Sequence, residues 1–168
     1  MRNKKLICYG ILVSAFIILG IYLYTKAPPA IDDNFNITFR YGVGAKNELN
    51  TFEGTYQKDM VVDPSITVNL SLSSEEKERI YQKMFEKNFF DYPDRFPQRR
   101  DRIVTPSMEY YLKVEYGYKI KEVSWDDNSL FENENIEKGL NDISGLIIEI
   151  IESKDEYKNL PTPRGGYL

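Results

Sequence analysis

An uninterrupted apolar run near the N-terminus constrains this chain more than any other feature of its sequence. The run extends from Leu6 to Tyr24 and contains no charged residue. As a helix it would be about 28 Å long, close to the roughly 30 Å hydrocarbon thickness of a membrane, whereas the apolar core of a cleaved signal peptide spans only about 7 to 15 residues. It therefore predicts a retained transmembrane helix of the signal-anchor type, with secretion after signal cleavage as the alternative.

The charges that flank this run predict the orientation of the chain in the membrane. Arg2, Lys4 and Lys5 precede the run, and Asp32 and Asp33 follow soon after it. Because basic flanks remain on the cytoplasmic side, we expect a cytoplasmic N-terminus. The C-terminal domain of this single-pass cell-membrane protein is then extracytoplasmic.

The composition beyond the run excludes several classes of function. All 26 acidic residues follow Lys26 but only 18 of the 22 basic ones do, which leaves 18 minus 26, or −8, on this part of the chain. A nucleic-acid partner is therefore not expected, because it would require a basic face. The chain contains no His, so the usual general base and the commonest zinc ligand are both missing. We expect no catalytic residues, no cofactor and no metal site, and hence a protein that is not an enzyme.

Changes in residue pattern divide the chain into four parts. Residues 1–26 form the cytoplasmic stub and the anchor, and 27–34 form a linker that contains Pro28 and Pro29. Residues 35–160 are predicted to be the extracytoplasmic domain, because they contain the alternating and helical apolar patterns of a folded core. The last segment, 161–168, is predicted to be an exposed tail.

Period-two alternation predicts strands at 35–43, 52–60, 68–72, 110–116 and 119–125, with turns at Asp63-Pro64 and Gly117. The pair Ser73 and Glu76 forms a capping box and predicts a helix from Ser74 to Asn88. A second capping box, Ser129 with Glu132, precedes a helical apolar stripe, which consists of Ile136, Leu140, Ile143, Ile147 and Ile150. The fold class is therefore α+β in the order β-β-β-α-β-β-α, a small antiparallel sheet with two helices packed on one face.

The pattern from Leu70 to Glu76, followed by Asn88-Phe89-Phe90, resembles small bacterial cell-envelope domains of unknown function. In those domains a hairpin leads to a short strand, a capped helix and a Phe-Phe pair. Lys121 to Trp125 and the last helix lie in the corresponding places. The resemblance implies an architecture and a place in the cell envelope, and it brings no activity with it.

Four arginines crowd the segment between the first helix and the second hairpin: Arg95, Arg99, Arg100 and Arg102. The segment is rich in Pro and lacks periodicity, so it is predicted to be a long surface loop. Guanidinium groups bind phosphate and carboxylate in a bidentate manner, so this loop is the candidate contact for an anionic ligand or a partner. The alternative is a solvated loop whose arginines pair with Asp91, Asp94 and Asp101.

Three functions follow from these patterns. The first is non-catalytic binding of another envelope protein or an anionic polymer by the membrane-anchored domain. The second is a small hydrolase that uses carboxylates at strand ends, drawn from Asp59, Asp63, Asp126 and Asp127. For these carboxylates, turn formation is the competing explanation. The third is an accessory subunit of a membrane protein complex, although Gly10 and Gly20 are too far apart for a GxxxG packing motif.

Overall fold

The computed structural model describes residues 16–17, 31, 34–101 and 103–167. The chain divides into two compact units, 1–30 and 31–168. Of the first unit, Phe16 and Ile17 are described, and both are helical and exposed. The rest of the predicted Leu6–Tyr24 span lies outside the described residues. Among the residues that are described, no helix is both long and apolar enough to cross a membrane.

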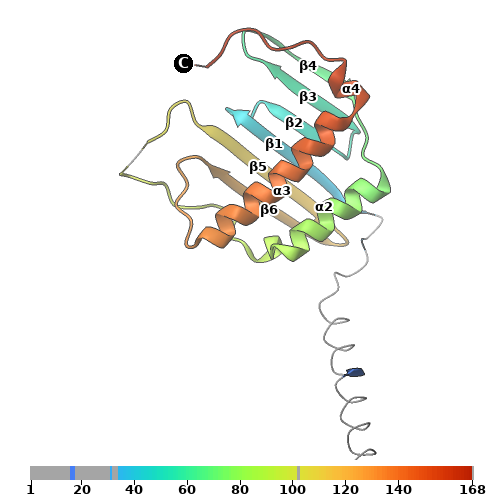
Figure 1. Ribbon diagram of the computed structural model, residues 1–168, viewed down its shortest axis with the longest axis vertical. Helices are drawn as coiled ribbons and strands as arrows, with labels where there is room; N and C mark the ends of the chain where they lie inside the picture. Colours follow the sequence, from blue (N-terminus) through green and yellow to red (C-terminus); the bar gives the residue numbers. More distant parts are fainter. Residues whose placement is uncertain (1–15, 18–30, 32–33, 102, 168) are drawn as a thin grey trace, which may run out of the picture. The chain divides into compact units, whose positions relative to one another are not determined.

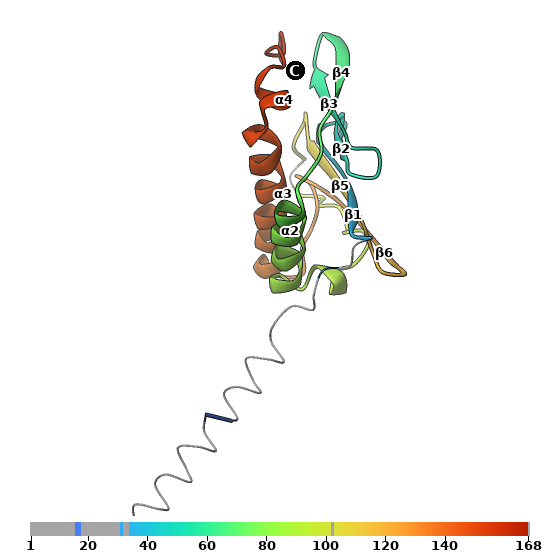
Figure 2. The same cartoon turned by 90° about the vertical axis from the view of Figure 1, so that its right-hand side faces the viewer.

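The second unit is a sheet covered on one face by helices (Figures 1 and 2). Its described strands are β1 (Asn36–Val43), β2 (Asn47–Asn50), β3 (Thr55–Met60), β4 (Asp63–Asn69), β5 (Met108–Tyr116) and β6 (Lys119–Asp126). They pair antiparallel throughout, in the order β4-β3-β2-β1-β5-β6. The helices are α2 (Ser74–Glu86) and α3 (Glu134–Ser153), followed by the short α4 (Asp155–Lys158), and a 3₁₀ turn, η1 (Phe89–Asp91), follows α2. The α+β class is therefore confirmed.

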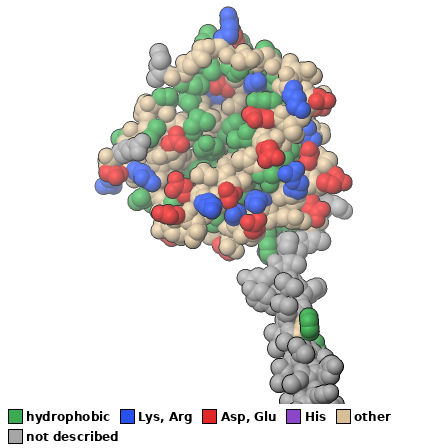
Figure 3. All heavy atoms as spheres, viewed as in Figure 1, with side chains coloured by type: hydrophobic (Ala, Val, Ile, Leu, Met, Phe, Trp, Pro, Cys, Tyr) green, Lys and Arg blue, Asp and Glu red, His purple; other side chains and the backbone are tan. Residues whose placement is uncertain are grey.

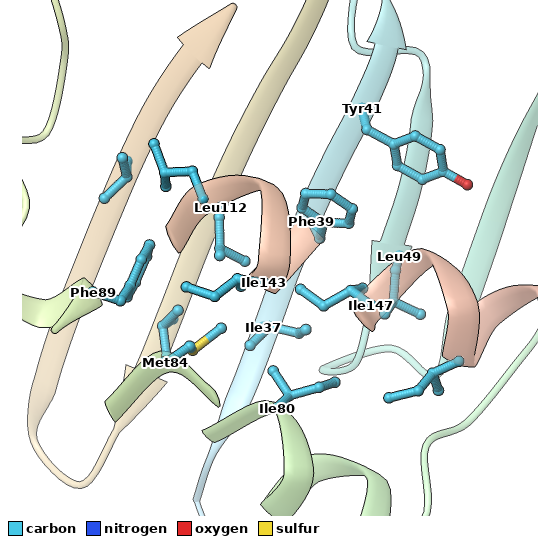
Figure 4. Packing of buried hydrophobic residues seen from close by; sticks show 14 of the residues in the cluster. Ile37, Phe39, Tyr41, Leu49, Ile80, Met84, Phe89, Leu112, Ile143 and Ile147 are labelled. Atoms are coloured by element: carbon cyan, nitrogen blue, oxygen red, sulfur yellow. The ribbon is translucent and has the colours of Figure 1, made fainter. Parts of the chain in front are cut away.

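The core lies between α3, α2 and the inward face of the sheet (Figure 4). Ile143 and Ile147 of α3 are fully buried, as are Phe39 of β1 and Leu112 of β5. The predicted stripe is confirmed, since Leu140 and Ile150 are also buried, and Ile136 packs at its margin. Acidic and basic side chains are interspersed over the face that carries the helices (Figure 3).

The capping box of the first helix is confirmed. The Ser73 hydroxyl accepts a hydrogen bond from the Glu76 amide at 3.2 Å, and the Glu76 carboxylate accepts one from the Ser73 amide at 2.8 Å. The helix ends at Glu86, two residues before the predicted end, because Asn88 adopts a left-handed conformation with φ of 55°. Lys154, which follows α3, donates to the same Glu76 carboxylate at 2.6 Å, so the cap also joins the two helices.

The predicted second capping box is wrong. The N-cap of α3 is Asn133, whose side chain accepts hydrogen bonds from the amides of Asn135 and Ile136. Ser129 is buried, and its hydroxyl donates to the Asp126 carboxylate at 3.0 Å. The Ser129 hydroxyl therefore bonds within the turn that follows β6 and does not cap α3.

The predicted number of strands is also corrected, from three to four before the first helix. The sequence predicts a turn at Ala45-Lys46-Asn47-Glu48, but residues 47–50 form β2 and pair with both β1 and β3. The predicted turn at Asp63-Pro64 is the start of β4, and the chain reverses at Val61, where φ is 63°. A β-branched residue rarely adopts a positive φ. Here the Asp59 carboxylate accepts a hydrogen bond from the Val61 amide at 3.0 Å.

Replacing Ile147 by Ala should lower the free energy of unfolding by about 2 to 5 kcal/mol, because it leaves a cavity at the centre of the core. Urea denaturation of residues 31–168, followed by far-UV circular dichroism, measures this. Asn141→Ala, on the exposed face of the same helix, is the control and should change the value by about 0.5 kcal/mol or less. Equal effects of the two substitutions would contradict the central place given to α3.

Candidate functional site

The segment that carries the arginines is fixed along the outer edge of β6. The Ser124 amide donates to the Asp94 carbonyl oxygen at 2.9 Å, and isolated bridges join Arg95 to Ser124 and Gln98 to Ser129. The region between η1 and β5 is therefore a loop, as predicted, but its first part has a defined position against the sheet.

The loop that joins β6 to α3 holds the next part of this segment. The Arg99 amide donates to the Asn128 carbonyl oxygen, and the Leu130 amide donates to that of Pro97, both at 2.7 Å. Phe96 is buried and contacts Phe131, with 4.7 Å between ring centroids. Backbone bonds and an aromatic contact therefore hold the two segments together.

The side chain of Asn128 secures the far end of the arginine segment. Its Oδ1 accepts a hydrogen bond from the Val104 amide at 2.6 Å, and its Nδ2 donates to the Val104 carbonyl oxygen at 3.2 Å. Both main-chain groups of Val104 are thus satisfied by one amide side chain.

Three of the four arginines that the sequence predicts as a contact lie on the segment held by these hydrogen bonds. Arg102 lies outside the described residues. Arg95, Arg99 and Arg100 are all exposed. The Arg99 Nε donates to the Ser129 carbonyl oxygen at 3.3 Å. Neither Arg95 nor Arg100 forms a hydrogen bond or ion pair with a side chain in the described part of the chain. Asp94, one of their expected partners, pairs instead with Lys121, at 2.8 Å.

A pocket of about 350 Å³ opens beside Arg95. Its lining combines polar and aromatic residues from β5, β6 and the two loops, among them Arg95, Gln98, Tyr110, Tyr111, Ser124 and Trp125. The rings of Tyr110 and Trp125 are stacked, with centroids 5.1 Å apart and planes 6° apart. Trp125 is 6% exposed, and its indole Nε1 is a buried donor with no acceptor among the described residues.

The tyrosines of this pocket are neutral hydrogen-bonding groups at physiological pH. Burial raises the pKa of Tyr110 above its usual range, and the charge of Asp127 adds to this effect. Burial likewise raises the pKa of Tyr111, together with the charge and the hydrogen bond of Glu122. Both phenols can therefore donate a hydrogen bond to a ligand.

Two carboxylates, Glu109 and Asp126, also line the pocket. Asp126 is saturated by local donors: its Oδ1 accepts from the Asn128 amide at 2.9 Å and from the Ser129 hydroxyl at 3.0 Å, and the Gln98 amide contacts both carboxylate oxygens. These hydrogen bonds stabilise the negative charge of Asp126 within the turn that follows β6. Glu109 is exposed at the start of β5.

The carboxylates proposed for a hydrolase do not converge. Asp59 lies in β3 and Asp126 at the end of β6, four strand spacings away in the sheet, or about 19 Å. Asp127 accepts a hydrogen bond from the Met108 amide at 2.8 Å. Within the described residues, no group of three or more acidic or Cys side chains is arranged to hold a metal ion.

Asp59 and Asp63 instead fix the C-terminal segment. Asp63 forms a bidentate pair with Arg164, with N···O distances of 2.8 and 2.6 Å, and the guanidinium lowers the pKa of Asp63. Asp59 is 9% exposed and accepts a hydrogen bond from the Tyr167 hydroxyl. Residues 164–166 are exposed, as predicted for the tail, yet the segment is attached to the hairpin of β3 and β4.

The buried hydroxyls of Tyr41 and Tyr56 lie near this attachment and are hydrogen-bonded to each other at 2.7 Å. Burial raises the pKa of Tyr41 to about 12, and burial, followed by the charge and hydrogen bond of Tyr41, raises that of Tyr56 further. These residues are ordinary core groups at neutral pH, and they make stability depend on pH only in the alkaline range.

A scan against protein-family models found no match to this chain, and a search of curated proteins found none either. The resemblance of Leu70–Glu76 and Asn88–Phe90 to bacterial envelope domains therefore stays a prediction. Function has to be inferred from the site itself.

Replacing Asn128 by Ala should loosen the arginine segment, because the Val104 amide loses its acceptor. We expect faster hydrogen exchange in residues 99–104 and unchanged exchange in α3, measured by mass spectrometry. Asn159→Ala, at an exposed position after α4, should change neither. Unchanged exchange in Asn128→Ala would mean that this side chain does not hold the segment.

The free energy of unfolding should fall as the pH rises from about 10 through about 12. The pKa values of Tyr41 and Tyr56 are raised above their unfolded value of about 10, so the unfolded chain loses these protons first, and the stabilisation present below pH 10 is lost. Urea unfolding at several alkaline pH values measures the slope. Tyr41→Phe should reduce it, whereas Tyr118→Phe, which removes a fully exposed phenol, should not.

Proposed function

We propose that this protein is a non-catalytic binding domain that recognises an anionic polymer of the cell envelope through Arg95, Arg99 and Arg100. The N-terminal apolar segment holds the domain on the extracytoplasmic side of a membrane. We base the placement on the length of the Leu6–Tyr24 run and on the basic residues before it.

The observation that carries the binding proposal is a set of exposed guanidinium groups on a fixed backbone, with no carboxylate partner among the residues that the structure describes. Elsewhere in the described chain, basic side chains such as Arg40, Lys87 and Arg164 form ion pairs of 2.6 to 2.7 Å with acidic neighbours. Arg95 and Arg100 form none. Because the backbone of this segment is already held in place, it loses less conformational freedom on binding, which favours affinity.

An extended ligand fits this site better than a compact one. Arg95 lies beside β6, and Arg99 and Arg100 follow it against the loop after β6, so successive phosphate or carboxylate groups of a chain could bind to them in turn. The pocket beside Arg95 could then receive one unit of the polymer against the edge of Tyr110 and the side chains of Gln98 and Ser124. A small anion alone would leave most of this lining without contact.

The hydrolase alternative has less support, because each of its four carboxylates is engaged in a turn, a chain end or a strand start, and the two at the core of the hypothesis are about 19 Å apart. The accessory-subunit alternative depends on the N-terminal segment, which lies outside the described residues apart from Phe16 and Ile17.

Reversing two charges should weaken binding strongly without changing the fold. We expect the variant Arg95→Glu/Arg100→Glu of residues 31–168 to bind long-chain polyphosphate or polyglutamate at least tenfold more weakly than the parent, since a hydrogen bond to a charged group contributes about 1.5 to 3 kcal/mol. Isothermal titration calorimetry at low and high salt measures the affinity, with neutral dextran as the uncharged probe. The thermal midpoint should be nearly unchanged, because neither side chain has a partner in the described part of the domain.

Arg79→Glu/Lys138→Glu is the matched control, with two exposed basic residues on α2 and α3 and the same change of net charge. It should retain most of the binding. Equal losses in both variants would indicate attraction to overall charge, and unaltered binding in the first would reject the arginine site. If the folded parent binds none of the polymers, the polymer proposal fails, and a protein of the envelope becomes the ligand to test by crosslinking.

A further inference from the structure

The two edges of the sheet differ in how they are protected. At β6, the segment 94–98 covers part of the edge, and the uncovered part carries Lys119 and Glu122. At β4, no segment in the described part of the chain runs along the outer side. The C-terminal segment bridges Val61, two residues before β4 begins, and goes no further along the edge.

The outward main-chain groups of β4 can be assigned from its pairing with β3. The Leu70 amide donates to the Gly54 carbonyl oxygen at 2.8 Å, and the register pairs Val68 with Tyr56. In an antiparallel ladder, hydrogen-bonded pairs alternate with non-bonded ones. The N–H and C=O groups of Ser65, Thr67 and Asn69 therefore point away from β3. All three residues are exposed, and none of these groups has a partner among the described residues.

This edge lacks the usual devices that prevent strand pairing. No charged residue occurs from Pro64 to Ser74, whereas natural edge strands are commonly blunted by Lys, by Pro or by bulges. Pro64 is not one of the outward residues, so its missing N–H leaves the outward ladder complete. The irregularity in the register lies between Lys58 and Met60, beside the first residues of β4, and the remainder of the strand is regular.

We propose that β4 pairs with β4 of a second copy of this chain, antiparallel, about a two-fold axis at Thr67. In this register, Thr67 faces Thr67 and Ser65 faces Asn69, and each of these pairs exchanges two backbone hydrogen bonds. One sheet then runs through both copies. The arrangement is closed, because each copy uses the same strand.

The side chains of β4 suit this register. On the open face of the sheet, polar residues face polar residues, namely Ser65, Thr67 and Asn69. On the face that carries the helices, Ile66 faces Val68 of the second copy, and Val68 already packs against the margin of the core. The paired residues, 65 to 69, carry no charge, and Asp63 at the start of β4 is paired with Arg164 of its own chain, so two copies can pair along this edge without like-charge repulsion. The inference does not rest on the proposed function, because it involves neither the arginines nor the pocket.

Disulfide crosslinking of the full-length chain tests the register. In a Cys8→Ser background, which removes the only cysteine, Thr67→Cys should form an intermolecular disulfide on mild oxidation. The two Cα atoms of a hydrogen-bonded pair are about 5.5 Å apart, within the range of a disulfide. Ser65→Cys is the matched control on the same strand and face. Its two copies would be four residues out of register, about 13 Å apart, and should crosslink at least tenfold more slowly.

Sedimentation equilibrium of residues 31–168, the compact unit with its own core, tests the association without the N-terminal segment. Thr67→Lys should raise the dissociation constant of the dimer at least tenfold, because it places two like charges opposite each other. Ile120→Lys, at an exposed position of the β6 edge, should leave it unchanged. A parent that stays monomeric would overturn the proposal, and so would equal crosslinking at positions 65 and 67. A monomeric parent would overturn it even if a strand of a different protein occupies the edge.

Discussion

The burial of one helix face against one sheet face is the interaction on which the rest of this domain depends. Ile143 and Ile147 of α3 lie against Phe39 and Leu112 at the centre of the sheet, and all four are fully buried. Burying a side chain of this size contributes about 1.5 to 3 kcal/mol. Because both long helices lie on the same face, the other face remains polar. The functional features are therefore confined to edges, strand ends and loops.

Much of this architecture could be predicted because it follows from local periodicity. The stripe that includes Leu140 and Ile150 gave the position of α3, and the alternation around Gly117 gave the hairpin of β5 and β6. What escaped prediction depends on distant partners. Residues 47–50 contain two Asn, one Glu and one Leu, a poor strand sequence, and they are extended because β1 and β3 pair with them on both sides.

The arginine segment of the candidate site also combines a feature that the sequence predicts with one that depends on distant residues. Its charge and lack of periodicity are visible in the sequence, so the cluster itself could be predicted. The contacts that hold it could not, because Asn128 and Ser129 lie 24 and 30 positions away along the chain from the residues they contact. A local signal was present, since Asp126-Asp127-Asn128-Ser129 is dense in side chains that bond to nearby main-chain groups. That signal indicates a turn and does not identify the segment that the turn holds.

The position of α3 in the chain has a consequence for biosynthesis. Strands β1 to β4 are complete by Asn69, yet α3, the longer of the two helices that cover the apolar face of the sheet, begins only at Glu134. A ribosome releases the chain from its N-terminus, so these strands emerge long before their cover. Until then α2 is the only one of the two long helices available to cover the inward side chains of β1 to β3, and the core is complete only when the C-terminal part of the chain is available. For the extracytoplasmic placement that we propose, the chain would reach a translocation channel before α3 has covered the sheet, in the incompletely folded condition that passage through a narrow pore requires.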